Sequence, residues 1–304
     1  MADAPGAAPG APPEEPPEAP PALPSLHALD LSALQRRDPT LLKDNDPGSD
    51  LIEDGVYCLD AVAWEAQRLK LPVLGDGCAS RLILIRGALR FEGLRDMVDE
   101  LAEFMKDDVK VPKTMKQGNV VGRKECTFGA DYKKYGVPIP LADAPALAKL
   151  VLEYTKEVAE KNPNESGGPG GPASFTGVHC NWYADGKAGV QPHQDDEPQL
   201  VKGAPIFSYT FLKNANGCAG TDPLPREFRI YNAEPLDGEK RKRGDKVGSV
   251  WLGQGDLLIM AGAMQTYFFH EVPKTSNQKY GNTQRINMTV RAFTPEAVAA
   301  VEQP

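Results

Sequence analysis

The sequence of 304 residues is poor in histidine, in paired cysteine motifs and in long apolar runs. Its five cysteines are an odd number and form no C-x-x-C motif, which argues against a disulfide scaffold and favours reduced thiols in an intracellular protein of the nucleus or cytoplasm. A run of about 18 apolar residues is missing, so no transmembrane helix and no membrane partner are expected. The N-terminus also lacks the basic-then-apolar order of a signal peptide.

A surplus of positive charge is absent as well, since the formal net charge is −8. This balance argues against a general nucleic-acid coat, whose footprint is a basic surface, but it leaves a local basic groove open. The apolar fraction of 41% is enough for a sizeable core.

The composition divides the chain into three parts. Residues 1–25 are mostly Pro, Ala, Gly and Glu, cannot bury a core, and are expected to be a disordered tail that is either solvated or a docking segment. Residues 26–108 are interpreted as an N-terminal extension whose helices pack on the core. Residues 109–298 are interpreted as the main domain, and a monomer is expected.

The apolar periodicity predicts an α+β, mainly β fold. Apolar residues at steps of three and four predict a helix over 94–107, and further helices are expected over 61–71 and 140–161, the last with Asp143 as its N-cap. Short strands at steady spacing predict a double-stranded β-helix of the jelly-roll kind, with helices from the N-terminal half buttressing one outer face. Strands are expected around 51–60, 175–183, 204–212, 255–262 and 285–293, and residues 80–94 are expected to form a strand followed by a turn.

A histidine and an aspartate stand two positions apart in HQDDE. In an extended strand His193 and Asp195 face the same side, where imidazole and carboxylate could share one metal ion. The chain has only four histidines, and His270, which follows an apolar run, is the best candidate for a third ligand. Two histidines and one carboxylate with open positions form the facial triad of non-heme Fe(II) oxygenases. A lone H-x-D pair is also common in surface turns.

The segment RINMTVR, residues 285–291, alternates polar and apolar side chains. Arg285, Asn287, Thr289 and Arg291 share one strand face. If that face is buried, two guanidiniums are costly unless an anion meets them. Because arginine binds carboxylates bidentately, a small dicarboxylic acid would suit this face. The alternative is an edge strand with a solvated face.

These motifs occur in an order that resembles the AlkB family, whose members are Fe(II)- and 2-oxoglutarate-dependent dioxygenases that oxidatively demethylate nucleic acid bases. The resemblance covers roughly residues 110–295 and includes HQDDEP, GAPIFSYTF, GDLLIMAGAMQTYFFHEVPK and RINMTVRAF. The residues that carry it are Asn181, Tyr183, His193, Asp195, His270, Arg285, Asn287 and Arg291.

The resemblance implies a role for each of these residues. His193, Asp195 and His270 would hold Fe(II), with 2-oxoglutarate and O₂ at the open positions. Arg285 would anchor the distal carboxylate of 2-oxoglutarate, with further hydrogen bonds from Asn181 and Tyr183. Arg291 would lie near the metal-side carboxylate or hold Asp195, and Asn287 would be a supporting contact. An N-methyl group would be hydroxylated and lost as formaldehyde.

The resemblance also implies substrate contacts. Residues 109–136 are locally basic with interleaved aromatics, which suits a substrate lid that stacks bases and neutralises phosphates, although an ordinary surface hairpin has the same pattern. Asp196 and Glu197 would read the polar edge of a cationic base such as 1-methyladenine or 3-methylcytosine, single-stranded or flipped out of a duplex, in DNA or RNA. The predicted lid contacts are Arg123, Phe128, Tyr132 and Tyr135.

Other interpretations stay open. The same cofactors could serve a 2-oxoglutarate oxygenase that acts on a protein or small molecule, and the fold could serve a non-catalytic binding module. The basic run 240–243 suits a nucleic-acid contact loop, a nuclear localisation signal or a solvated hairpin tip. His179 is interpreted as a residue that packs beside the site or supports a ligand, rather than as a ligand itself.

Overall fold

The computed structural model describes thirteen stretches of the chain. They are residues 52–59, 64–69, 80–113, 115–116, 119–120, 122–132, 136–161, 167–168, 171–172, 174–214, 223–234, 241–275 and 283–302. The predicted tail at 1–25 lies outside them. None of the helices in these stretches combines the length and the apolar character needed to span a bilayer.

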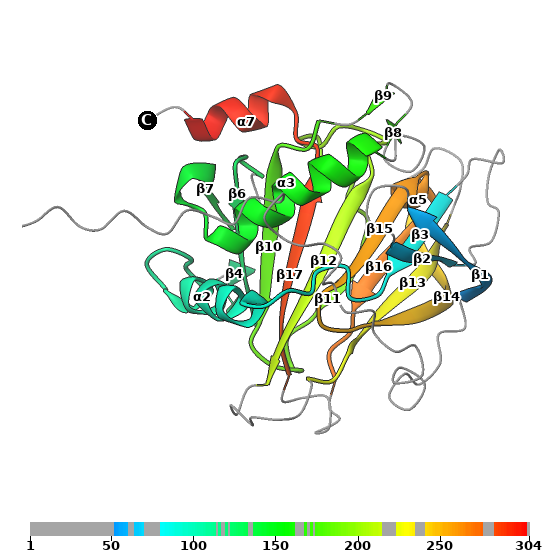
Figure 1. Ribbon diagram of the computed structural model, residues 1–304, viewed down its shortest axis with the longest axis horizontal. Helices are drawn as coiled ribbons and strands as arrows, with labels where there is room; N and C mark the ends of the chain where they lie inside the picture. The colour runs from blue at the N-terminus through cyan, green and yellow to red at the C-terminus, as the bar shows by residue number, and fades with distance from the viewer. Residues whose placement is uncertain are drawn as a thin grey trace, which may run out of the picture.

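A nine-stranded sheet is the largest element of the described fold (Figure 1). Its neighbouring strands are antiparallel except for the parallel pair β6 and β7. In spatial order the strands are β1 (Ile52–Leu59), β2 (Trp64–Leu69), β3 (Ser80–Ile85), β15 (Asp256–Gly262), β12 (Ile206–Asn214), β17 (Thr283–Arg291), β10 (Gly177–Tyr183), β6 (Arg123–Phe128) and β7 (Val137–Ile139).

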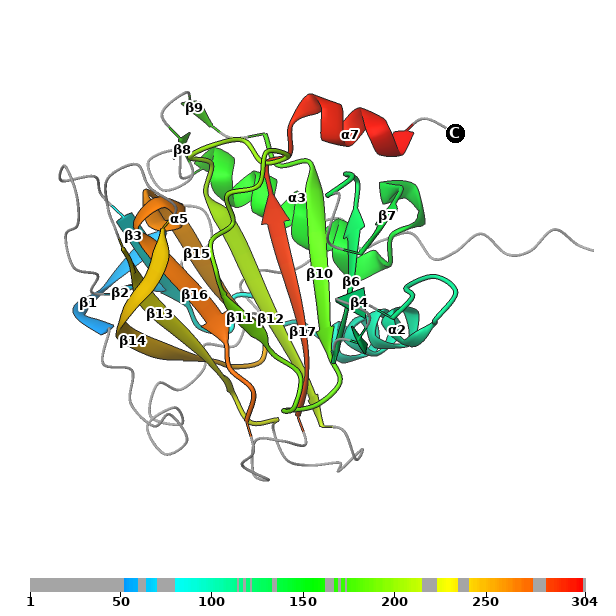
Figure 2. The same ribbon diagram turned by 180° about the vertical axis from the view of Figure 1, so that it is seen from behind.

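A second sheet of four strands packs on one face of the first (Figure 2). Its order is β11 (Val190–His193), β16 (Phe268–Val272), β13 (Arg226–Glu234) and β14 (Lys242–Leu252). Side chains from both sheets share one apolar cluster, to which β3 contributes Leu82 and Leu84 and β13 contributes Phe228 and Ile230. The predicted jelly-roll architecture in a mainly β fold is therefore confirmed.

Helices cover the opposite face of the large sheet (Figure 1). They are α2 (Leu94–Lys106) and α3 (Ala146–Lys161), and both bury an apolar stripe in a second cluster. Because strand side chains alternate, β3 sends Ile83 and Ile85 into this helix-side cluster and its other apolar residues toward the small sheet. Apolar clusters thus cover both faces of the large sheet at β3 and β15, which is why these two strands are almost continuously apolar.

The remaining described elements are short. They are the 3-10 helix η2 (Leu141–Asp143), α5 (Met264–Tyr267), α7 (Pro295–Glu302), the hairpin of β4 (Met115–Lys116) with β5 (Asn119–Val120), and the pair β8 (Gly167–Gly168) with β9 (Gly171–Pro172). Cys126 and Cys180 are buried free thiols that lie opposite each other on β6 and β10, in agreement with the expected reduced state.

Two local predictions are wrong. The helix expected over 61–71 is replaced by β2, which pairs with β1 and β3, so the available strand edges outweigh the helix-favouring composition. Asp143 is not the N-cap of α3, because it belongs to η2. The helix begins after Pro145, whose carbonyl accepts hydrogen bonds from the backbone N–H groups of Ala148 and Lys149.

Candidate metal centre

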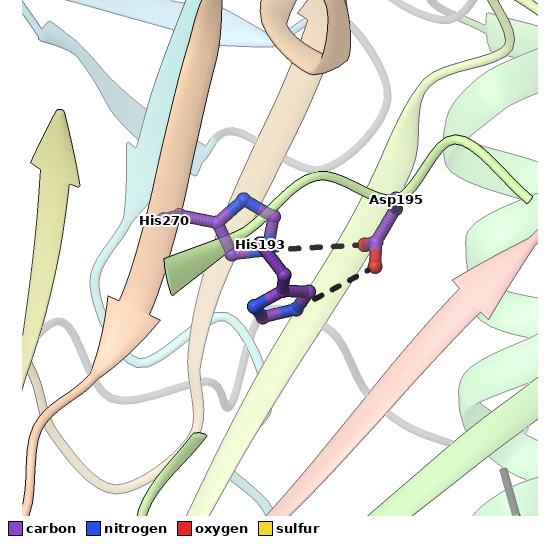
Figure 3. Close-up of side chains that lie close together, drawn as sticks. All are labelled: His193, Asp195 and His270. Atoms are coloured by element: carbon purple, nitrogen blue, oxygen red, sulfur yellow. Dashed lines mark ion pairs between the residues drawn. The ribbon is translucent and has the colours of Figure 1, made fainter. Parts of the chain in front are cut away.

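Three predicted ligands converge at one edge of the small sheet. His193 ends β11 and lies directly opposite His270 on the neighbouring strand β16, while Asp195 follows two residues after His193. One ligand atom from each residue lies within 4.8 Å of the others. Figure 3 shows the two imidazoles turned toward the carboxylate, with 3.7 Å from His193 Nε2 to Asp195 Oδ1 and 3.9 Å from His270 Nε2 to Asp195 Oδ2. The spacing suits a single ion between them.

The protonation states of the cluster suit metal binding. Burial disfavours a charged Asp195, but Arg291 and the two histidines outweigh it and hold the pKa of this carboxyl below its usual range. Arg291 Nη2 donates to Asp195 Oδ2 at 2.9 Å. Burial and the neighbouring His193 lower the pKa of His270 to about 3. An ionised carboxylate and a neutral imidazole are the forms that ligate a metal.

Neighbouring groups fix the orientation of the ligands. The Nδ1 of His193 lies 2.9 Å from the carbonyl of Gln191, which directs the Nε2 toward the cluster. The ring of Phe228 stacks on that of His270 with centroids 5.3 Å apart. The backbone N–H of Asp195 donates to Gln265 Oε1 at 2.9 Å. The cluster is therefore held in place by the protein itself.

A cavity of about 310 Å³ lies between the sheets beside the cluster. The polar residues that line it come largely from β10 and β17 and include Asn181, Tyr183, Asn287, Thr289 and Arg291. The alternation predicted for residues 285–291 is confirmed, because the three apolar residues of β17 pack in the helix-side cluster. β17 is a central strand, so the edge-strand alternative does not apply.

Arg285 is a buried cation with unused hydrogen-bonding capacity. Its side chain is 1% exposed, and its Nη2 donates to Thr210 Oγ1 at 3.1 Å. The Nε and Nη1 atoms have no partner among the described residues. Burial lowers the pKa of Arg285 to about 10, and the guanidinium lies 5.3 Å from the ring centre of Tyr183, a cavity-lining residue. A carboxylate is the group that would satisfy these donors.

Asn287 is already satisfied by the protein. Its Nδ2 donates to Ser208 Oγ at 2.8 Å and to the carbonyl of Tyr209 at 2.9 Å, and its Oδ1 accepts from Thr289 at 3.2 Å. Asn181 lies opposite Asn287 in the register of β10 and β17. Asn287 therefore supports the pairing of β12 with β17 at the cavity wall.

A wider groove of about 800 Å³ opens on the outer side of the metal ligands. Asp196 and Glu197 line it, and Tyr132 donates its hydroxyl to Glu197 Oε2 at 2.6 Å. Arg241 also lines the groove, with its guanidinium bonded to the carbonyl of Thr266. Lys242 and Arg243 begin β14, Arg241 directly precedes this strand, and Lys240 lies outside the described residues.

Several predicted lid contacts are placed differently by the structure. Phe128, predicted as a lid contact, is not accessible to a substrate, because its ring is fully buried in the helix-side core, 5.8 Å from that of Phe104. Tyr132 is 4% exposed and packs edge-on against His179, so it offers no free face to a base. Arg123 lines the inner cavity and pairs with Glu125 at 2.5 Å, and Tyr135 lies outside the described residues.

Other residues of the site were not expected to be there. His179 is buried, lines the inner cavity and shares a 3.0 Å hydrogen bond with Thr127, which agrees with its interpretation as a packing residue. Arg226 binds backbone carbonyls near the cavity, and Gln265 holds the backbone of Asp195. No sequence motif marks the last two, since their partners are brought together only by the fold.

Comparison with known proteins agrees with this geometry. The family model described as "2OG-Fe(II) oxygenase superfamily" matches residues 82–291. The chain is 32% identical over 123 residues to alpha-ketoglutarate-dependent dioxygenase alkB homolog 3 of Rattus norvegicus, which is 40% of this chain and 37% of that protein. It is 30% identical over 122 residues to DNA oxidative demethylase ALKBH2 of Mus musculus, which is 40% of this chain and 45% of that protein.

The chain thus spans less than half the length of these curated relatives. Two solved structures are also similar. OsALKBH1 aligns with a TM-score of 0.41 and 20% identity, over 69% of this chain and 97% of that one. A prolyl hydroxylase from Trichoplax adhaerens aligns with a TM-score of 0.42 and 13% identity, over 73% of this chain and 87% of that one.

The fold and the His-Asp-His cluster define a non-heme iron oxygenase. The family match shows that the chain belongs to the 2OG-Fe(II) oxygenase superfamily. The cofactors of this family of oxygenases are Fe(II), the cosubstrate 2-oxoglutarate and O₂. The residues present fit these groups, because the cluster offers a 2-His-1-carboxylate donor set and Arg285 offers buried, unpaired donors for a carboxylate.

Proposed function

We propose that this protein is an oxidative demethylase of N-methylated bases in nucleic acid, of the 1-methyladenine and 3-methylcytosine type. The observation that carries the proposal is a row of carboxylates, Asp195 to Glu197, that runs from the metal cluster into the open groove. The relatives named as a DNA oxidative demethylase and as alkB homolog 3 support it. Such an activity would serve DNA repair or RNA demethylation, in the nucleus or cytoplasm.

The residues around the cluster would divide the work. His193, Asp195 and His270 would hold Fe(II), and Arg285 would bind the distal carboxylate of 2-oxoglutarate, assisted by Tyr183 and Asn181. With O₂, these groups supply the oxidation of a methyl C–H bond while 2-oxoglutarate becomes succinate and CO₂. The hydroxylated N-methyl group then leaves as formaldehyde, which restores the unmodified base.

Arg291 would keep the metal carboxylate in place. Its Nη2 bonds to Asp195 Oδ2, and its guanidinium lies 5.3 Å from the ring centre of Tyr132. Tyr132 in turn holds Glu197 at the groove. A chain of contacts thus connects the metal ligand to the groove where the base would lie.

A cationic base would suit the carboxylate end of the groove, whose lining elsewhere includes Lys202 and Arg241. Arg291 pairs with Asp195, and Tyr132 donates to Glu197, but Asp196 is exposed. Burial and then the neighbouring Glu197 raise the pKa of Asp196, which indicates that more positive charge would be favourable there. Adenine methylated at N1 and cytosine methylated at N3 carry this positive charge. To approach the metal, such a base must be flipped out of a duplex or lie in a single strand.

The direct test is release of formaldehyde from single-stranded oligonucleotides that carry 1-methyladenine or 3-methylcytosine. The protein is supplied with Fe(II), 2-oxoglutarate and ascorbate, and His193→Ala serves as the blank. Release by the wild type alone is expected, and DNA and RNA oligonucleotides are compared side by side. Succinate formed without any formaldehyde from either oligonucleotide would reject the proposed substrate and favour an oxygenase of proteins or small molecules.

Substitution of the groove carboxylates tests base recognition. We expect Asp196→Asn with Glu197→Gln to lower kcat/KM for the cationic bases by more than about a hundredfold, since each of the two lost charge contacts is worth about 1.5–3 kcal/mol. Succinate formation without substrate should stay close to the wild-type rate. The matched control is Glu234→Gln at the end of β13, away from the groove lining. Unchanged kcat/KM in the double variant would exclude these carboxylates from base reading.

A further inference from the structure

Arg226 is a third buried arginine near the cosubstrate cavity, after Arg285 and Arg291, and its hydrogen bonds go to residues outside the metal cluster. It begins β13, and its side chain is 3% exposed. Among the described residues, its guanidinium donates to backbone carbonyls alone: Nη1 to Asp185 at 3.2 Å, and Nη2 to Gly186 at 3.3 Å, to Ala188 at 2.6 Å and to Pro273 at 3.1 Å.

These carbonyls belong to two segments that close one end of the cavity. Residues 184–189 carry the chain from β10 in the large sheet to β11 in the small sheet, and Pro273 directly follows β16. The crossover therefore connects the strand of Asn181 and Tyr183 to the strand of the metal ligand His193. Arg226 fastens this crossover to the end of the strand that carries His270.

The seam between the two segments is tight and lies at the cavity wall. Gly189 lines the cavity, and a Cβ atom at that position would come within 2.6 Å of the carbonyl oxygen of Val272. The backbone N–H of Thr275 donates to the carbonyl of Gly186 at 2.8 Å. Val272 and Lys274, on either side of the bonded Pro273, both line the cavity. Loss of the Arg226 guanidinium would remove the hydrogen bonds that hold residues 184–189 against the end of β16 at the cavity wall.

Arg226 also adds positive charge where a dicarboxylate would end. The buried ring of Tyr183 lies in the electrostatic field of Arg285, Arg123 and Arg226. Burial lowers the pKa of Arg226, and its charge is solvated by peptide carbonyls. The neighbouring Asp185 uses Oδ1 to accept from the backbone N–H groups of Lys187 and Ala188. A neutral residue at position 226 would not contribute positive charge at this end of the cavity.

We propose that Arg226 is a positioning residue for 2-oxoglutarate: it closes the cavity end by fastening the 184–189 crossover to the end of β16, and it adds a buried positive charge beside Arg285. It acts through the cavity wall and through Arg285 rather than by touching the metal. The distal carboxylate of the cosubstrate is the group whose binding depends on it.

The test is the affinity of 2-oxoglutarate for the full chain loaded with Mn(II), measured by calorimetry without O₂ or nucleic acid. We expect Arg226→Gln to weaken 2-oxoglutarate binding by at least about tenfold, the equivalent of one charge-assisted hydrogen bond, with Mn(II) affinity within about threefold of wild type. Arg226→Lys, which keeps the charge but not the fork, should show a smaller loss. In succinate assays the KM for 2-oxoglutarate should rise with little change in kcat.

The control is Arg229→Gln on the same strand, where the arginine pairs with Glu227 at 2.8 Å. It should leave both affinities unchanged. Unchanged 2-oxoglutarate affinity in Arg226→Gln, or an equal loss of Mn(II) and 2-oxoglutarate affinity, would overturn the proposal. If Arg226→Gln does not fold, the Mn(II) and 2-oxoglutarate affinities of Arg226→Lys test the proposal in the same way. Because no nucleic acid is used, the outcome is independent of the proposed substrate.

Discussion

Asp195→Asn is expected to lose Mn(II) and Fe(II) affinity by more than about a hundredfold, and with it all succinate formation. Mutation of a residue that only hydrogen-bonds to a metal ligand lowers metal affinity by about tenfold to a hundredfold. Loss of Asp195, the one anionic ligand, should lower it further. The free protein should also be destabilised by about 3–5 kcal/mol, because Arg291 would be left as a buried cation without its partner.

A double variant separates these two effects. In Asp195→Asn with Arg291→Met, the uncompensated charge is gone, so the free energy of unfolding in urea should recover most of the loss while metal affinity does not return. Calorimetry with Mn(II) and urea unfolding at the same pH measure both quantities. Metal affinity within threefold of wild type in Asp195→Asn would show that this carboxylate is not a ligand.

The metal cluster and the cavity wall could be predicted from the sequence because both follow from short-range geometry. In an extended chain, residues two apart face the same side, which placed His193 with Asp195 and Arg285 with Asn287. The scarcity of histidine left few candidates for the third ligand, and His270 does lie opposite His193. The central strands could be predicted for the same reason, since their apolar alternation persists over several residues.

The residues that depend on which strands become neighbours could not be predicted. Phe128 belongs to a segment rich in basic and aromatic residues that suits an exposed lid, yet β6 is covered by α2, so its ring is buried. β2 has a helix-favouring composition and becomes a strand only because β1 and β3 flank it. The partners of Arg226 are backbone carbonyls from distant segments, and such partners leave no mark in a sequence.

Arg285→Met is expected to have opposite effects on stability and on cosubstrate binding. In the free protein the guanidinium is buried with two nitrogen atoms unpaired, so an apolar side chain of similar length removes a desolvation cost. Replacement of buried charge by apolar groups is often stabilising by about 1–4 kcal/mol, and we expect the free energy of unfolding to rise within that range. A cost in stability for a binding site is common in enzymes.

The same substitution should weaken 2-oxoglutarate binding by more than about a hundredfold, because a bidentate carboxylate pair contributes two charge-assisted hydrogen bonds of about 1.5–3 kcal/mol each. Thermal unfolding with and without 2-oxoglutarate and Mn(II) shows both effects at once: a higher Tm for the free variant and no further rise on addition of the cosubstrate. The control is Arg229→Met on the exposed side of β13, which should bind 2-oxoglutarate as the wild type does. A variant that is less stable when free would mean that Arg285 serves the fold, and one that still gains Tm with 2-oxoglutarate would mean that another residue binds the distal carboxylate.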